Sequence, residues 1–155
     1  MYTNKKHMQI PSSFQPFNKR TLIVVTNTLK AKLFLAQDQN VEEIGIIDVA
    51  ADLAQESNDR EALRDGGSGH DEDSTKKDHI TKDHFYHALN ENLMHRMQNN
   101  EFDALVFTVP EELKNELKEY LHVQLLKKTT TFVPKNLMND DLLDIIIMIR
   151  ELPEE

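Results

Sequence analysis

The run Asp103-Ala-Leu-Val-Phe-Thr-Val109 is the clearest structural signal in this chain of 155 residues. After its first residue every side chain is apolar or β-branched, which is typical of a buried strand. Pro110 follows directly and has no N–H group to donate to a sheet, so we predict that the strand ends there. The run at 21–26, Thr-Leu-Ile-Val-Val-Thr, has the same character and predicts a second buried strand.

Three more strands and three helices are predicted around these two strands. The strands are expected at 30–36, 41–49 and 129–133, and the helices at 81–99, 111–121 and 140–150. The first three strands in the chain are joined by short polar connections, which predicts an antiparallel meander. The sequence therefore predicts an α/β fold with five strands, opening on that meander.

Charge is unevenly distributed along the chain, whose formal net charge is −9. Residues 1–20 contain no acid and carry four cations, Lys5, Lys6, Lys19 and Arg20. We therefore predict a flexible basic arm over 1–20 that can contact an anionic partner such as RNA, followed by a single α/β domain over 21–155. The acidic body argues against a broad nucleic-acid surface.

Several classes of protein are excluded by what the sequence lacks. There is no cysteine, so disulfides, zinc–thiolate sites and cysteine nucleophiles are excluded. No apolar run approaches the roughly 20 residues of a membrane helix, and the N-terminus lacks the apolar region of a secretory signal. We therefore expect a cytoplasmic location and no membrane partner, and no pattern calls for a cofactor.

A glycine-rich segment precedes the long predicted helix. Three of the four glycines of the chain lie within 66–70, which reads Gly66-Gly67-Ser68-Gly69-His70. Such a segment predicts a mobile loop, and long loops in small domains are often functional. Ser68 and His70 are the candidate catalytic pair, although adjacency in the sequence does not by itself build a nucleophile, base and acid. We treat Gly66–His70 first as a binding loop.

The predicted helix at 81–99 has an apolar face and a face with potential metal ligands. Phe85, Leu89 and Leu93 recur every four residues and predict the buried face. The opposite face carries four candidate ligands, His84, His87, Glu91 and His95. Imidazoles and a carboxylate at this spacing can bind zinc or nickel. A solvated polar face without a metal is the simpler interpretation.

The segment at 141–150 is apolar on most sides. Ile145, Ile146 and Ile149 fall on one helical stripe with Leu142, while further apolar side chains lie outside the stripe. Such a helix either packs deep in its own domain or meets a partner, which could be a second copy bound through residues 140–152. A buried strand is the remaining alternative, because isoleucine also favours strands.

Three stretches resemble signatures of the bacterial host-attachment protein family. Residues 22–34, with Lys30-Ala-Lys-Leu-Phe34, resemble its opening hairpin. Residues 101–117, in which a Phe-Asp strand runs into Pro110, resemble its second signature, and Thr131–Leu137 resembles its closing strand. The order of elements over 21–137 also resembles the middle domain of eukaryotic and archaeal class I peptide release factors. The resemblance implies a ribonuclease-H-like layered fold with a mixed sheet.

One departure from the release factors bears on function. Those proteins carry Gly-Gly-Gln in the loop, whereas this chain continues from Gly66-Gly67 into Ser68, and its loop is acidic. The resemblance therefore implies a non-enzymatic binding module in a translation-linked or RNA-linked setting, with the ribosome or RNA as partner. Two alternatives stay open: a hydrolase of peptidyl-tRNA or phosphodiesters acting through Gly66–His70, and a self-associating interaction protein.

Overall fold

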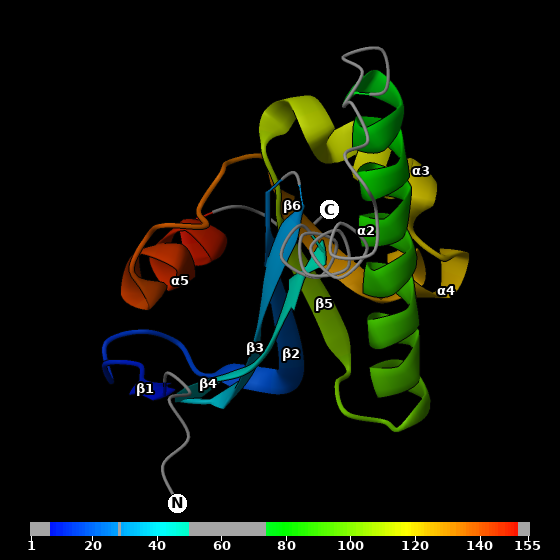
Figure 1. The fold of residues 1–155 in the computed structure, drawn as a ribbon. Helices are drawn as coiled ribbons and strands as arrows, with labels where there is room; N and C mark the ends of the chain where they lie inside the picture. The colour runs from blue at the N-terminus through cyan, green and yellow to red at the C-terminus, as the bar shows by residue number, and fades with distance from the viewer. Residues whose placement is uncertain (1–6, 28, 50–73, 152–155) are drawn as a thin grey trace, which may run out of the picture.

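The computed structural model describes residues 7–27, 29–49 and 74–151 (Figure 1). These residues form one six-stranded mixed sheet in the order β1-β4-β3-β2-β5-β6. The strands are β1 (His7–Gln9), β2 (Phe17–Thr26), β3 (Lys30–Asp38), β4 (Asn40–Asp48), β5 (Ala104–Thr108) and β6 (Thr129–Val133). The helical elements are α2 (Ser74–Gln98), the 3-10 turn η2 (Glu111–Leu113), α3 (Lys114–Tyr120), α4 (Val123–Lys128) and α5 (Leu142–Glu151).

The sheet combines antiparallel and parallel pairing. Strands β2, β3 and β4 form an antiparallel meander, whereas β5 is parallel to β2 and β6 is parallel to β5. Parallel neighbours need long crossover connections, and helices lie between β4 and β5 and between β5 and β6 in the chain. The predicted α/β class and opening meander are confirmed, but the sheet has six strands where five were predicted.

Helices cover both faces of the sheet, with α5 on one face and α2, α3 and α4 on the other (Figure 1). Successive residues of a strand point to opposite faces. Leu22 and Val24 accordingly join the core on the α2 face, and Ile23 and Val25 join the core on the α5 face. All four side chains are fully buried. Burial on both faces explains why 21–26 is a continuous apolar run without alternation.

The apolar stripe predicted for the long helix packs on the sheet. Phe85, Leu89 and Leu93 are at most 1% exposed and belong to the core on the α2 face. The helix starts earlier than predicted, at Ser74, and ends at Gln98. No helix within the described residues is both long and apolar enough to cross a membrane.

The last apolar segment forms helix α5, not a strand. Ile145, Ile146 and Ile149 belong to the core on the α5 face, with exposed fractions of 2%, 0% and 7%. Ile147 lies outside that stripe and is half-buried. Packing within its own domain therefore accounts for the stripe, and association of two copies through 140–152 stays a prediction.

Part of the segment that the sequence predicts as a flexible basic arm over residues 1–20 lies in the sheet, because His7–Gln9 and the residues from Phe17 onward form strands. Strand β1 pairs antiparallel with β4, and β2 begins at Phe17, where the sequence predicted a start at Thr21. Ile10 and Phe17 are 2% and 5% exposed and anchor the segment in the core on the α5 face. The positive charges of this segment predict an exposed arm, whereas burial of these two apolar residues holds it against the sheet.

The helix predicted at 111–121 is divided, and a second helix follows it. The chain forms η2 and α3 and then α4, which the sequence analysis missed. The side chain of His122 caps α4 by accepting a hydrogen bond from the backbone N–H of Gln124 at 3.1 Å. Ser, Thr, Asp and Asn are the preferred residues at this position, so the sequence offered no start signal.

Candidate anion-binding cleft

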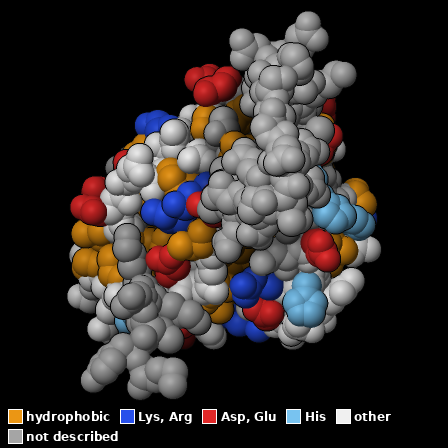
Figure 2. Space-filling view, viewed as in Figure 1, with side chains coloured by type: hydrophobic (Ala, Val, Ile, Leu, Met, Phe, Trp, Pro, Cys, Tyr) orange, Lys and Arg blue, Asp and Glu red, His pale blue; other side chains and the backbone are white. Residues whose placement is uncertain are grey.

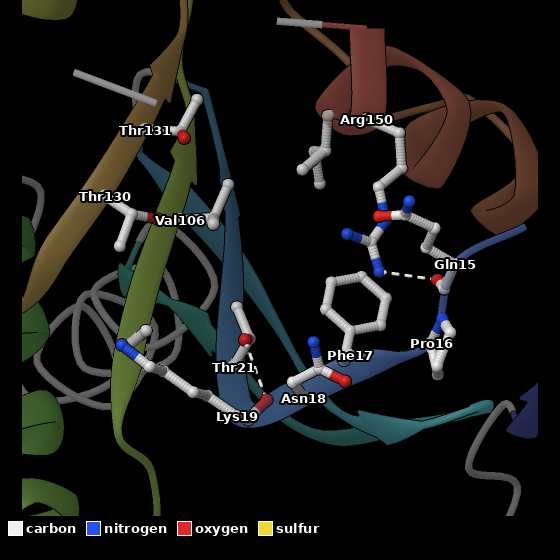
Figure 3. Close-up of a pocket in the computed structure, with 12 residues that line it drawn as sticks. Gln15, Pro16, Phe17, Asn18, Lys19, Thr21, Val106, Thr130, Thr131 and Arg150 are labelled. Atoms are coloured by element: carbon white, nitrogen blue, oxygen red, sulfur yellow. Dashed lines mark hydrogen bonds between the residues drawn. The ribbon is translucent and has the colours of Figure 1, made fainter. Parts of the chain in front are cut away.

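A cleft of about 390 Å³ lies where β2, β5 and β6 begin, on the face of the sheet that α5 covers (Figure 3). Parallel strands begin at the same end of a sheet. The starts of β2, β5 and β6 therefore lie close together, although they are far apart in the sequence. The segment before β2, the first residues of β5 and β6, and the end of α5 all contribute to the lining. None of the lining residues is acidic, although acids outnumber bases by 27 to 18 in the whole chain.

Arg150, near the end of α5, forms one side of the cleft. Its guanidinium carbon lies 4.0 Å from the centroid of the Phe17 ring, and its Nη2 donates a hydrogen bond to the backbone oxygen of Gln15 at 2.8 Å. In the part of the chain that the structure describes, this arginine forms no ion pair. Desolvation by its neighbours lowers the pKa of Arg150, but an arginine stays charged at neutral pH. Most of its five N–H donors remain available to a ligand.

Lys19 lies across the cleft from Arg150, and polar groups line the space between them (Figure 3). The Lys19 side chain is exposed and has no ion-pair partner among the described residues. The hydroxyl of Thr21 donates to the backbone oxygen of Lys19 at 3.0 Å, and the hydroxyl of Thr130 donates to that of Leu105 at 3.3 Å. These features fit an anionic ligand, because the cleft presents two cations and further polar groups beside apolar residues.

Comparison with known families identifies the protein at the level of its family. Residues 20–149 match the family model described as bacterial archaeo-eukaryotic release factor family 12. The chain belongs to this family. No curated protein matches the chain. The predicted relationship to release factors is confirmed, whereas the narrower resemblance to host-attachment proteins stays a prediction.

The cations predicted to form an anion-binding arm do not lie together in this protein. Lys19 lines the cleft, while Lys5 and Lys6 lie outside the described residues. Arg20 points elsewhere and is occupied: its Nη2 lies 3.1 Å from Oδ1 of Asp103, and its Nη1 donates to the backbone oxygen of Asn100 at 2.6 Å.

This tether joins the start of β2 to the segment before β5. Hydrogen bonds from Arg20 lower the pKa of the Asp103 carboxyl, as expected of an ion pair. Arg20 therefore has a structural role, and Lys19 is the member of the predicted set that faces the cleft.

The candidate metal ligands are not gathered into a site. His84, His87, Glu91 and His95 are all exposed on α2, and Figure 2 shows histidine side chains on the surface over this helix. His87 Nε2 lies 3.5 Å from Glu91 Oε2, and His95 lies beside Asn99. Within the described residues no group of three or more potential ligands is close enough to hold a metal ion.

The glycine-rich binding loop, with Gly66, Gly67, Ser68, Gly69 and His70, lies outside the described residues. Its role, and that of Ser68 and His70 as candidate catalytic residues, stays a prediction.

Sequence reasoning missed most of the cleft. Arg150, Thr130 and Thr131 were not singled out, nor was the segment 15–18. The available signal was Arg150 itself, the one cation in the apolar segment 141–150. Its significance depends on the parallel order of β2, β5 and β6, which places these strand starts beside the end of α5.

Proposed function

We propose that this family 12 protein is a non-catalytic binding module that contacts RNA of the translation machinery through the cleft between Lys19 and Arg150. The observation that carries the proposal is the acid-free lining of this cleft in a chain with a formal net charge of −9. The acidic body repels an anionic partner in general, so such a partner gains most at a cleft that is lined by two cations and no carboxylate.

RNA is favoured over other anionic partners by family membership. The family is described as a bacterial archaeo-eukaryotic release factor family. A release-factor description points to the translation machinery, whose largest anionic component is RNA. Arginine forks and lysine ammonium groups both bind phosphate oxygens, and RNA presents these at regular intervals. A contact through two cations is weak and sensitive to salt, as expected of a module that docks reversibly.

A binding role is favoured over catalysis by the chemistry of the cleft. Its lining contains no carboxylate, histidine or other group that could act as a general base at neutral pH. In the glycine-rich loop, Ser68 stands where release factors carry the glutamine that follows their glycine pair. Both observations support a protein that recognises its partner without cleaving it.

The ribonuclease-H-like fold implied by the resemblance is part of this proposal. An antiparallel meander of three strands followed by two strands parallel to the first supports it, as do helices on both faces of the sheet. In this interpretation β1 is an addition at the edge of a five-stranded layer.

Co-sedimentation with ribosomes tests the proposed function. The full chain is expected to pellet with ribosomes at low salt, and the double variant Lys19→Gln, Arg150→Gln is expected to lose at least tenfold in affinity. For a site that neutralises two phosphates of a single strand, log K falls with log salt at a slope of about −1.4, or about sevenfold between roughly 50 and 200 mM salt. Deletion of residues 1–20 is unsuitable, because it removes β1 and the start of β2.

The matched control carries the same change in charge away from the cleft. Lys127 and Lys135 are exposed and do not line the cleft, so Lys127→Gln, Lys135→Gln is expected to bind as the unmodified chain does. Equal loss in both double variants contradicts the proposal, because it would assign binding to net charge alone. Absence of binding at low salt contradicts it as well.

A further inference from the structure

We propose that the cleft holds a single phosphorylated nucleotide, with its phosphate at the guanidinium of Arg150 and Lys19 on the opposite side of the cleft. This inference rests on the proposed function and specifies the chemical class of the ligand. The family match ends at residues 20 and 149, so neither cation lies in the matched region and the match assigns no role to them.

The size of the cleft sets the first limit on the ligand. Its volume of about 390 Å³ lies near the lower end of the range for small-molecule sites, which is about 300–1,000 Å³. A space of this size accommodates one nucleotide and excludes a double helix. RNA that uses the cleft must therefore present an unpaired nucleotide, as single-stranded ends and loops do.

The charge and geometry of the lining set the second limit. Arg150 and Lys19 lie on opposite sides of the cleft and give it a positive potential, and the planar guanidinium of Arg150 can bind two phosphate oxygens at once. The hydroxyl of Thr131 is on the same lining and makes no hydrogen bond within the described residues. It can donate to a phosphate oxygen or to the sugar.

The position of Phe17 sets the third limit. Arg150 covers this ring, with 4.0 Å between the guanidinium carbon and the ring centroid, and Phe17 itself is 5% exposed. We therefore assign base stacking to the guanidinium plane and not to the buried ring, since arginine planes are established partners for nucleobases. The exposed amides of Gln15 and Asn18 lie at the rim and can pair with the polar edge of a base. Inorganic phosphate can use neither the stacking surface nor the amides, so these contacts favour a nucleotide over inorganic phosphate.

Calorimetric titration of the full chain with nucleoside 5′-monophosphates tests the inference. We expect the monophosphates to bind at least tenfold more tightly than the matching nucleosides and than inorganic phosphate. Lys19→Gln is the cleaner variant, because the Lys19 side chain makes no hydrogen bond or ion pair among the described residues, and it is expected to weaken binding at least threefold. Arg150→Gln is expected to weaken binding at least tenfold, and Arg150→Lys to fall in between. Lys127→Gln is the matched control and is expected to change nothing.

Two ligand sources share this chemistry, and a second titration separates them. A short single-stranded oligoribonucleotide with a 5′-phosphate is compared with the same oligonucleotide without it and with the free monophosphate. Preference for the phosphorylated end supports an RNA terminus, and preference for the monophosphate supports a free nucleotide. Binding of monophosphates no tighter than that of inorganic phosphate, or unchanged in both cleft variants, overturns the inference.

The proposed function and this inference can fail separately. If cleft variants lose ribosome binding while monophosphates do not bind, the result supports docking through the cleft and contradicts the nucleotide as its ligand. If monophosphates bind through Lys19 and Arg150 while ribosomes do not bind, the result supports nucleotide binding in the cleft and contradicts the translation-linked role.

Discussion

Replacement of Phe107 by alanine is expected to lower the free energy of unfolding by about 3–5 kcal/mol. Phe107 is fully buried in β5, and its ring lies parallel to that of Phe132, with 5.4 Å between centroids. Truncation removes a large apolar side chain between the sheet and its covering helices and leaves a cavity that β5 cannot close, because β5 is paired on both sides.

Urea unfolding followed by circular dichroism measures this effect. Val123 is 58% exposed, so Val123→Ala is the control, with an expected change within about 0.5 kcal/mol. A cost below about 1 kcal/mol for Phe107→Ala would mean that this residue is not in the core, and the parallel pairing of β2, β5 and β6 would have to be revised.

The second large effect is expected for Ile146→Ala, at about 2–5 kcal/mol. Ile146 is 0% exposed and packs in the core on the α5 face together with Val106 and Val133. The change also loosens the helix that carries Arg150 to the cleft, so nucleotide binding is expected to weaken with stability.

Ile147→Ala provides a matched control on the same helix, because Ile147 is half-buried and lies outside that core. We expect it to cost less than half as much as Ile146→Ala in the same urea titration. Equal costs would contradict the observed orientation of α5. They would indicate that a partner covers the apolar side chains of α5 that lie outside the core. Light scattering at several concentrations then reports directly on the predicted self-association.

Local patterns predicted the elements that carry their own signal. The strand at 129–133 has the predicted bounds, and the three meander strands were found because β-branched runs alternate with polar connections. Strand β1 has three residues, too few to show a period, and α4 lacks a conventional cap. The formation of β1 and α4 therefore depends on tertiary contacts, which a local sequence pattern does not reveal.

The candidate site could be predicted only in small part. Lys19 was selected because it is a cation in an acid-free segment, and it does line the cleft. Arg20, its neighbour, was selected for the same reason but points to Asp103, since successive strand residues face opposite sides of the sheet. Thr131 reaches the cleft through the order of the parallel strands, and Arg150 reaches it through the packing of α5 on the sheet. Both are non-local properties.

The most direct test of the cleft as the binding site is an NMR titration of the isotope-labelled full chain with a short single-stranded RNA. We predict that the backbone amide signals that shift most belong to Asn18 and Lys19, to Thr130 and Thr131, and to Arg150, all of which line the cleft. Shifts confined to the histidine face of α2, or no shifts at low salt, would contradict the account.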